Sequence, residues 1–360
     1  MKKALFYFFI LILLFIAYLL FNTFTFNSSQ LEVAVVDKVS VPAGAAQRLV
    51  EAIAIRTVSF EDEADFDSTQ FRLFNEFLVK NYPLINATLE HQTFNEFSHL
   101  YKWTGSNTAL APIILTSHTD VVPIASLRKW TVHPFTEGIK NDTIYGRGTM
   151  DDKFGVVGIM EAVEQLLQIG HQPKRTIYLA FGHDEEVSGH RGAEVMVNYL
   201  AEQGVTADFV LDEGQSITQR LVPGLNQQVA LIGIAEKGYA TLALQVDMMG
   251  GHSSMPAKET AIDVLATAIS KVKANPMPTQ LTPVLEGFMD KLGPEMDFKT
   301  KLFFANKHIF KPLILSAYEN ASPAANAIIR TTTSPLASLL SVLSISRIPN
   351  RTSPSTFLGC

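Results

Sequence analysis

The chain has 360 residues, of which 47% are apolar, so it can bury a full core and has room for about two domains. Its formal net charge of -6 argues against a nucleic-acid partner, because such partners select basic surfaces. The only cysteine is Cys360, which excludes an intrachain disulfide and a zinc site built from cysteines.

The first element is an unbroken apolar run from Ala4 to Phe21, preceded by Lys2 and Lys3. As a helix this run approaches the thickness of a bilayer's hydrocarbon core. We interpret residues 1–22 as a single-pass membrane anchor, with the lysines on the cytoplasmic side and the remaining chain on the other side. A cleaved signal peptide is the alternative, although the sequence that follows lacks a small-x-small cleavage site.

Two helices and a strand are predicted next. Apolar residues at helical spacing predict helices over 42–57 and 67–80, the second capped by Asp67 or Ser68. The apolar run that begins at Ile113 predicts a buried strand ending in polar residues. His118 and Asp120 would point to the same face there, so Asp120 could orient the imidazole while its other nitrogen binds a metal. By itself a His-x-Asp pair is a weak signal, since strand ends carry such pairs by chance.

The segment from Tyr145 to Lys153, YGRGTMDDK, places Asp151 and Asp152 side by side where a strand and a glycine-rich turn give way to a helix. Two adjacent buried carboxylates repel each other unless a cation pairs with them, which favours a bridging metal. The ordinary alternative is an exposed helix cap, because aspartate commonly begins helices.

Three strand-helix units follow in succession. Helical spacing predicts a helix over 153–170, then a strand over 176–181, a helix over 192–203 and a strand that ends in LDEG. This alternation predicts an α/β fold with a central sheet of mostly parallel strands. In such sheets ligands bind beyond the carboxyl ends of the strands, where five ligand-type residues would gather: His118, Asp151, Glu185, Glu186 and Asp212.

Imidazole and carboxylates together suit Zn²⁺ or a similar divalent ion, and the number of acids suits two ions bridged by one carboxylate. The ligand types alone do not separate Zn²⁺ from Co²⁺ or Mn²⁺. The plainer alternative is that acids at strand ends are solvated loop residues. Because four such clusters follow one another in the sequence, this alternative is the weaker interpretation.

The segments that carry these residues resemble a known family: SHTDVVP, WTVHPFTEGI, YGRGTMDDK, GHDEEVSG, LDEG and MMGGHSSMP. From about Pro42 to Pro335 the chain resembles the aminoacylase and carboxypeptidase S family of two-zinc metallopeptidases, most closely its carboxypeptidase S branch. The resemblance implies a zinc-binding catalytic domain, here residues 42–230, interrupted by a smaller α/β lid domain, here residues 231–335, that in many members dimerises.

By resemblance, His118 and Asp212 would bind one zinc and Glu186 would bind the second. Asp151, whose peptide bond to Asp152 would be cis as in the family, would bridge both ions. Glu185 would be the general base and Asp120 would hold the tautomer of His118. Two zinc ions would lower the pKa of a shared water, which would attack the amide carbonyl of a small peptide or an N-acyl amino acid.

Three further residues acquire roles only through the resemblance. His252 would stabilise the oxyanion, often in a neighbouring subunit's site, while Asn326 and Arg330 would grip a substrate carboxylate. Without it, His252 is a solvent-facing turn residue and Arg330 a surface charge. A strand is predicted over Tyr239–Val246 and a helix over Thr260–Ala274.

After Pro335 the resemblance stops, and residues 336–360 match nothing in the family. Members supply a terminal histidine for the second zinc, whereas the histidines after Asp212 here are His252 and His308. We therefore expect a C-terminally truncated chain with an incomplete lid. The expected function is zinc-dependent amide hydrolysis, and the alternative is a membrane-anchored, catalytically inactive homologue that only binds a ligand or partner.

Overall fold

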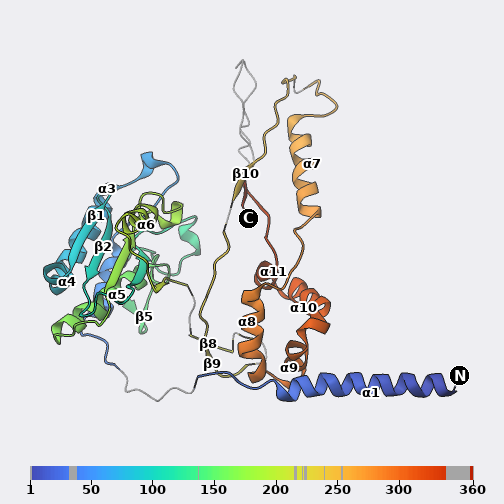
Figure 1. Ribbon diagram of the computed structural model, residues 1–360. Coiled ribbons are helices and arrows are strands. Elements are labelled where there is room, and N and C mark those ends of the chain that lie inside the picture. Colours follow the sequence, from blue (N-terminus) through green and yellow to red (C-terminus); the bar gives the residue numbers. More distant parts are fainter. Residues whose placement is uncertain are drawn as a thin grey trace. The chain divides into compact units, whose positions relative to one another are not determined.

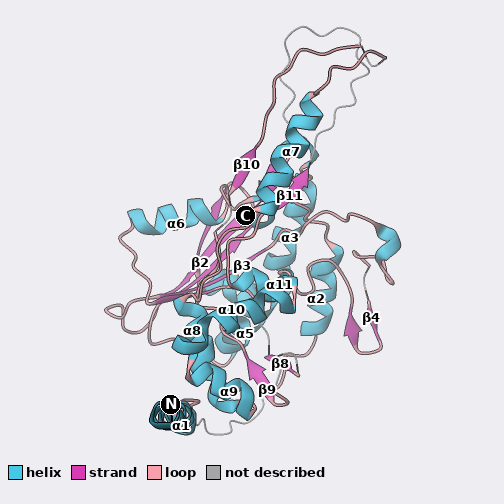
Figure 2. Cartoon of the chain, turned by 90° about the vertical axis from the view of Figure 1, so that its right-hand side faces the viewer, coloured by secondary structure: helices cyan, strands magenta, loops and turns pink. Residues whose placement is uncertain are grey.

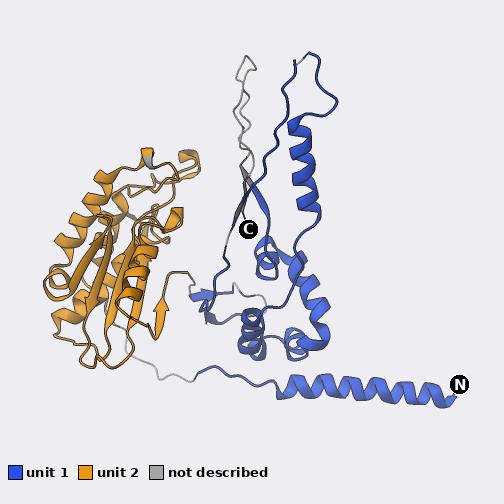
Figure 3. Ribbon diagram, turned by 45° about the horizontal axis from the view of Figure 1, so that its top comes forward, with its two compact units in different colours: residues 1–34, 215–360 blue, residues 35–214 orange. Residues whose placement is uncertain are grey.

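The computed structural model describes residues 2–31, 39–136, 138–214, 217–220, 222, 225–238, 240–252, 254–337 and 357–359. The chain divides into two compact units (Figure 3). We call residues 35–214 the sheet unit and residues 1–34 with 215–360 the helical unit. This division falls near the predicted boundary at residue 230, and the domain limits given above stay predictions. Most of the predicted tail, residues 336–360, lies outside the described residues.

The sheet unit is built around a five-stranded sheet of order β1-β2-β6-β3-β7. Strands β6, β3 and β7 pair in parallel, whereas β1 with β2 and β2 with β6 are antiparallel, so four of the five strands run in one direction. The predicted α/β fold with a mostly parallel sheet is confirmed. The strand bounds are β1 (Glu90–Phe94), β2 (Ser98–Trp103), β3 (Ile113–His118), β6 (Ile177–Gly182) and β7 (Phe209–Leu211).

Helices cover both faces of this sheet because alternate strand residues are apolar on both sides (Figures 1 and 2). Tyr101, Leu179 and Phe181 point into a core shared with four helices: α2 (Ala45–Ala54), α3 (Ser68–Asn81), α4 (Pro83–Thr88) and α5 (Lys153–Gln168). Leu100 and Ala180 point the other way, against α6 (Ala193–Glu202). The predicted cap of α3 is confirmed, because the Asp67 side chain accepts the Thr69 N–H group at 3.1 Å.

Short elements complete the sheet unit: η1 (Glu63–Asp65), η2 (Leu127–Lys129), β4 (Ile139–Lys140), β5 (Thr143–Ile144) and η3 (Glu185–Val187). Of these, η3 matters most for function, since it directly follows the carboxyl end of β6. It is a single 3₁₀ turn that carries two of the predicted site residues.

The helical unit contains both helices and short strands. Its core contains apolar residues from α8 (Pro283–Leu292), α9 (Phe298–Ala305), α10 (Lys307–Ala321) and several loops, including Met296 after η4 (Gly293–Glu295) and Ile329 after α11 (Pro323–Ile328). The predicted helix over Thr260–Ala274 is present as α7 (Ala261–Ala274), which Thr260 and Asp263 begin with a reciprocal capping box. The short strands are β8 (Ile217–Gln219), β9 (Gln228–Ala230), β10 (Thr241–Ala243), β11 (Ser334–Ala337) and β12 (Phe357–Gly359).

The apolar run at the N-terminus forms α1 (Lys2–Thr25), also in the helical unit. Among the described helices it is the one long and apolar enough to cross a membrane. All its side chains from Lys2 to Tyr18 are exposed, whereas a few in its last two turns are buried.

Candidate metal site at the carboxyl ends of the strands

His118 is the last residue of β3, and its side chain is buried, with 2% exposed. Its Nδ1 lies 3.2 Å from the Asp120 carboxylate and 3.1 Å from the Asp120 carbonyl oxygen. Both are acceptors, so Nδ1 carries the proton and donates to them. In the neutral imidazole this leaves the lone pair on Nε2, the atom that a metal would need.

Three carboxylates surround that Nε2 atom. The distances are 3.0 Å to Asp151 Oδ1, 3.5 Å to Glu213 Oε2 and 3.8 Å to Glu185 Oε2. Asp151 precedes α5, Glu185 lies in η3 after β6, and Glu213 follows β7. Strands that share a direction thus deliver their acids to one edge, and ligand atoms of His118, Asp151 and Glu213 all lie within 4.8 Å of one another.

Asp120 is fully buried and holds this edge together. Its carboxylate accepts hydrogen bonds from the Ser59 hydroxyl at 2.7 Å and from the backbone N–H groups of Glu185 and Glu186 at 3.2 and 3.1 Å. One side chain therefore orients His118 and also fixes the turn that presents two glutamates.

The sequence left open whether the adjacent aspartates bind a metal or cap a helix, and in the structure the two residues are placed differently. Asp152 is buried and caps α5, accepting the Gly155 N–H group at 3.2 Å and the Ser117 hydroxyl. Asp151 instead faces His118, and its side chain is 58% exposed. The peptide bond between them is cis. Burial raises the pKa of Asp152 to about 6, partly offset by the hydrogen bond from Ser117.

Negative charge is concentrated at this edge, and the pKa values of several groups there are raised. Burial and then the charge of Asp151 raise the pKa of Glu186 to about 7, and burial likewise raises the pKa of Glu185. Burial by itself would lower the pKa of His118, but hydrogen bonds and charges from Asp120 and Glu213 raise it to about 12. A divalent cation would relieve this repulsion, and the same carboxylates would be its ligands.

The turn after β6 contains buried acceptors without a partner among the described residues, of which Glu186 Oε1 belongs to a predicted ligand. Glu186 Oε1 is inaccessible to solvent and has no hydrogen-bond partner among the described residues. A buried carboxylate oxygen left in that state is costly unless a cation completes its surroundings. The imidazole and carboxylate donors therefore fit Zn²⁺ or a similar ion.

The acid after β7 differs from the expectation drawn by resemblance. The group of possible ligands contains Glu213 and not Asp212, whose exposed side chain accepts the backbone N–H group of Glu213 at 2.9 Å. The chain bends at Glu213 after β7, and in this arrangement Glu213 is the acid of the two that faces His118. The sequence did not single out Glu213, because the LDEG segment offers both acids with equal weight, and the assignment of Asp212 as a ligand stays a prediction.

The other three predicted site residues lie in the helical unit. His252 is exposed, and its Nδ1 lies 2.7 Å from the Ser254 hydroxyl. Arg330 is buried, its Nη2 donates to the Glu319 carboxylate, and its Nε has no partner among the described residues. Asn326 donates to the Glu319 carbonyl oxygen at 3.0 Å. Asn326 and Arg330 thus both bond to Glu319, the first through its backbone carbonyl and the second through its carboxylate, and their role in binding a substrate stays a prediction.

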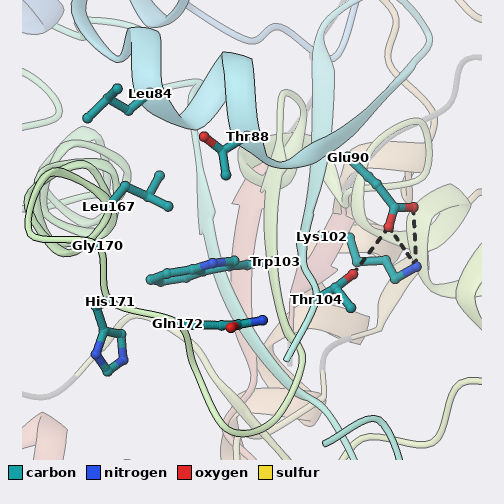
Figure 4. A pocket seen from close by; sticks show the side chains of 10 residues that line it. All are labelled: Leu84, Thr88, Glu90, Lys102, Trp103, Thr104, Leu167, Gly170, His171 and Gln172. Atoms are coloured by element: carbon teal, nitrogen blue, oxygen red, sulfur yellow. Dashed lines mark hydrogen bonds and ion pairs between the residues drawn. The ribbon is translucent and has the colours of Figure 1, made fainter. Parts of the chain in front are cut away.

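A pocket of about 380 Å³ lies elsewhere in the sheet unit (Figure 4). Trp103 lines it and pairs with Ile177 at the start of β6, whereas His118 pairs with Gly182 at the end of β6. The pocket is therefore at the opposite end of the strands from the acids. The two charged residues that line it, Glu90 and Lys102, form an ion pair with each other, with 3.0 Å between Lys102 Nζ and Glu90 Oε1.

Comparisons with known proteins define the class. Residues 114–291 match peptidase family M20/M25/M40. The chain is 43% identical over 290 residues to "N-fatty-acyl-amino acid synthase/hydrolase PM20D1" of Xenopus tropicalis, covering 80% of this chain and 56% of that protein. It is 40% identical over 326 residues to "Probable carboxypeptidase S-like 2" of Dictyostelium discoideum, covering 88% of this chain and 62% of that protein. The chain thus belongs to peptidase family M20/M25/M40 and spans somewhat more than half the length of these two relatives.

The fold agrees with this assignment. The M20 family metallo-carboxypeptidase Sso-CP2 from Sulfolobus solfataricus has a similar structure, with a TM-score of 0.53 and 17% sequence identity. The likeness covers 88% of this chain and 71% of that one.

Proposed function

We propose that this chain carries the metal-binding half of an amide hydrolase active on N-acyl amino acids or small peptides. The observation that carries the proposal is the convergence of His118, Asp151 and Glu213 at the carboxyl ends of the strands, with Glu185 beside them. The names of the two relatives above, a fatty-acyl amino acid synthase/hydrolase and a probable carboxypeptidase, support that substrate class.

The proposed ligand set is assigned residue by residue. His118 and Glu213 would hold one ion, Glu186, whose Oε1 has no partner among the described residues, would hold the second, and Asp151 would contribute to both. The donor types favour Zn²⁺. When bound, such ions polarise a carbonyl and make a water molecule acidic enough to act as a nucleophile near neutral pH.

The chain's own residues would carry the proton. Glu185 is half exposed, its Oε2 lies 3.8 Å from His118 Nε2, and its pKa is raised by burial. A carboxylate with a raised pKa takes a proton from water and returns it near neutral pH, here to the leaving nitrogen of the amide. Asp120 keeps Glu185 in place through the backbone N–H group of that residue.

Residues of the helical unit would bind the rest of the substrate. In this proposal Arg330 and Asn326 receive the substrate carboxylate, a role supported by the carboxylate that Arg330 already pairs with. His252 would stabilise the oxyanion. The helical unit would also mediate a homodimer, and α1 would anchor the chain in a membrane with the sheet unit on the non-cytoplasmic side.

The test uses the full chain purified in detergent, with Glu185→Gln and a matched control, Glu194→Gln, at an exposed position on α6. We expect about two zinc ions per chain in all three proteins, and hydrolysis of an N-acyl amino acid in all but Glu185→Gln. A chain that binds no zinc, or a Glu185→Gln variant as active as the control, would contradict the proposal.

A further inference from the structure

The end of α1 does not stand free of the rest of the helical unit. Leu19, Asn22, Thr23 and Phe26 are spaced as one helical face, and they are the buried or half-buried positions on that side. Thr23 is almost fully buried, with 1% exposed, whereas every side chain from Lys2 to Tyr18 is exposed. Asparagine and threonine on a packed face indicate a contact with protein, because lipid offers them no partners.

The contact is made with the junction between α9 and α10, beside which α1 ends in Figure 1. Asn306 is fully buried there; its Nδ2 donates to the Leu19 carbonyl oxygen at 3.1 Å, and its Oδ1 accepts from Asn22 at 2.8 Å. The Tyr18 hydroxyl lies 3.2 Å from His308 Nε2.

A glycine allows the last turn to approach. A Cβ atom at Gly293 would lie 2.6 Å from the ring of Phe26, which is closer than van der Waals contact permits. Gln30 continues the contact beyond the helix, donating to the Lys291 carbonyl oxygen at 2.7 Å. We call α9, α10 and the last two turns of α1 the docked cluster.

The length of α1 decides where this cluster lies. The apolar stretch that precedes the contact, Ala4 to Ala17, is about 21 Å long at about 1.5 Å per residue. A bilayer's hydrocarbon core is roughly 30 Å thick. If α1 crosses a membrane, this stretch is too short to do so while the docked cluster stays clear of the bilayer, so the cluster must enter the interface.

The surface of the docked cluster fits that position. Phe21, Phe24 and Phe298 are 66%, 70% and 52% exposed, and the rings of the last two lie 6.1 Å apart. Between Phe298 and Pro312 the sequence has four lysines and no acid, in a chain of net charge -6: Lys299, Lys301, Lys307 and Lys311. Aromatic rings with lysines beside them are the composition of segments that lie at the membrane surface.

We propose that the docked cluster is a membrane-contact surface whose partner is the phospholipid bilayer. The phenylalanines enter the region between headgroups and acyl chains, and the lysines, with Lys307 shared with Asp290, reach lipid phosphates. In this arrangement α1 is packed against the helical unit and holds it in a fixed orientation at the membrane, unlike an anchor joined through a flexible linker. The inference depends on the proposed anchoring by α1 and not on the proposed hydrolysis.

The test measures the depth of single spin labels on the full chain in phosphatidylcholine vesicles. Replacing the only cysteine, Cys360→Ser, gives a background for Phe298→Cys and for a control, Ile262→Cys, at an exposed position on α7. We expect the label at 298 to collide several-fold less with a water-soluble nickel chelate, and several-fold more with oxygen, than the label at 262. Adding phosphatidylserine should deepen the first label only.

The contact itself is tested by Asn306→Ala, with Asn320→Ala as the control, because among the described residues the Asn320 side chain bonds only to Ser316 of its own helix. We expect Asn306→Ala to make the label at 298 several-fold more accessible to nickel, and Asn320→Ala to leave it unchanged. Equal nickel accessibility at 298 and 262, in a chain that resists carbonate extraction, would overturn the inference alone. Removal of residues 1–25 by a signal peptidase would overturn both the anchoring and the inference, with hydrolysis still measurable.

Discussion

The backbone N–H group of Glu186 donates a hydrogen bond to the carboxylate of Asp120, at 3.1 Å and across 66 residues of chain. The same carboxylate accepts from Glu185 and orients His118. Two strand ends that are distant in sequence are therefore fixed by one buried acid. We therefore expect substitutions at Asp120 to act at once on the proposed metal site and on the proposed general base.

The first prediction concerns Asp120→Asn. An amide offers one acceptor oxygen in place of two, and its NH₂ group would face an N–H donor of the turn or the imidazole N–H. Loss of such a supporting group commonly lowers metal affinity by about 10- to 100-fold. We expect a loss of this size for zinc, measured by competition with a chromogenic chelator. Asp208→Asn, at a half-exposed partner of Arg175, is the control and should bind zinc as the wild type does.

The second prediction concerns Ser59, whose buried hydroxyl donates to Asp120 at 2.7 Å. Ser59→Ala leaves a buried carboxylate with one donor fewer, which costs about 1–3 kcal/mol in the free energy of unfolding. We expect this loss in urea unfolding and a lower kcat, both restored in part by Ser59→Thr. Unchanged kcat in Ser59→Ala would show that Asp120 is held well enough without it.

The third prediction separates the two acids after β7. Glu213→Gln removes a ligand atom 3.5 Å from His118 Nε2, whereas Asp212→Asn changes an exposed side chain that bonds to its own neighbour's backbone. We expect Glu213→Gln to lower the zinc content per chain and Asp212→Asn to leave it near the wild-type value. The reverse order would restore the assignment of Asp212 drawn from family resemblance.

The fourth prediction concerns pH. Burial, with the charges of His91 and His183, lowers the pKa of His99 to about 3. In the unfolded chain a histidine has a pKa of about 6.5, so between these values the unfolded state binds a proton that the folded state does not. The free energy of unfolding therefore falls as the pH drops below about 6.5, by about 1.4 kcal/mol for each unit.

Urea unfolding followed by the fluorescence of Trp103 and Trp130 checks this. Between pH 6.5 and 5 the wild type should lose about 2 kcal/mol through this histidine, a contribution that His99→Gln removes. The control His133→Gln changes an exposed histidine and should keep the wild-type slope. A His99→Gln protein with that same slope would refute the assignment.

The elements predicted correctly are those whose packing requires a regular pattern of apolar residues in the sequence. Val156, Met160 and Val163 follow the helical repeat because α5 buries one side against the sheet, and the structure has that helix over Lys153–Gln168. The buried strand at 176–181 was likewise visible, since parallel strands covered on both faces are continuously apolar.

The hairpin of β1 and β2 was missed because its signals are weak. Four of the five residues in β1 are exposed and the run EHQTF does not alternate. Its turn uses Asn95 and Glu96 at positive φ, where sequence rules expect glycine at the second position. The order of strands was also beyond the sequence, because β2 enters the sheet beside β6, more than 70 residues away.

For the candidate site, the sequence located the edge but not the exact groups. His118, Asp151, Glu185 and Glu186 meet there as expected, although their roles remain proposals. Whether Asp212 or Glu213 faces His118 depends on the direction in which the chain turns after β7. The sequence pattern does not predict that direction. Ser59 was not singled out either, because a lone serine in the segment between α2 and α3 carries no pattern.

The buried Asn306 bears on how a water-soluble form of this protein should be made. A cut after Thr25, where α1 ends, would remove the hydrogen bonds that Asn306 makes with Leu19 and Asn22, and would leave its side chain, among the described residues, only the bond to Leu302. A cut just before Tyr18 would remove only exposed turns and keep the last two, with Leu19 and Asn22 still bonded to Asn306. Shortening the protein by the outer turns alone should therefore give a better-behaved sample than complete removal of the helix.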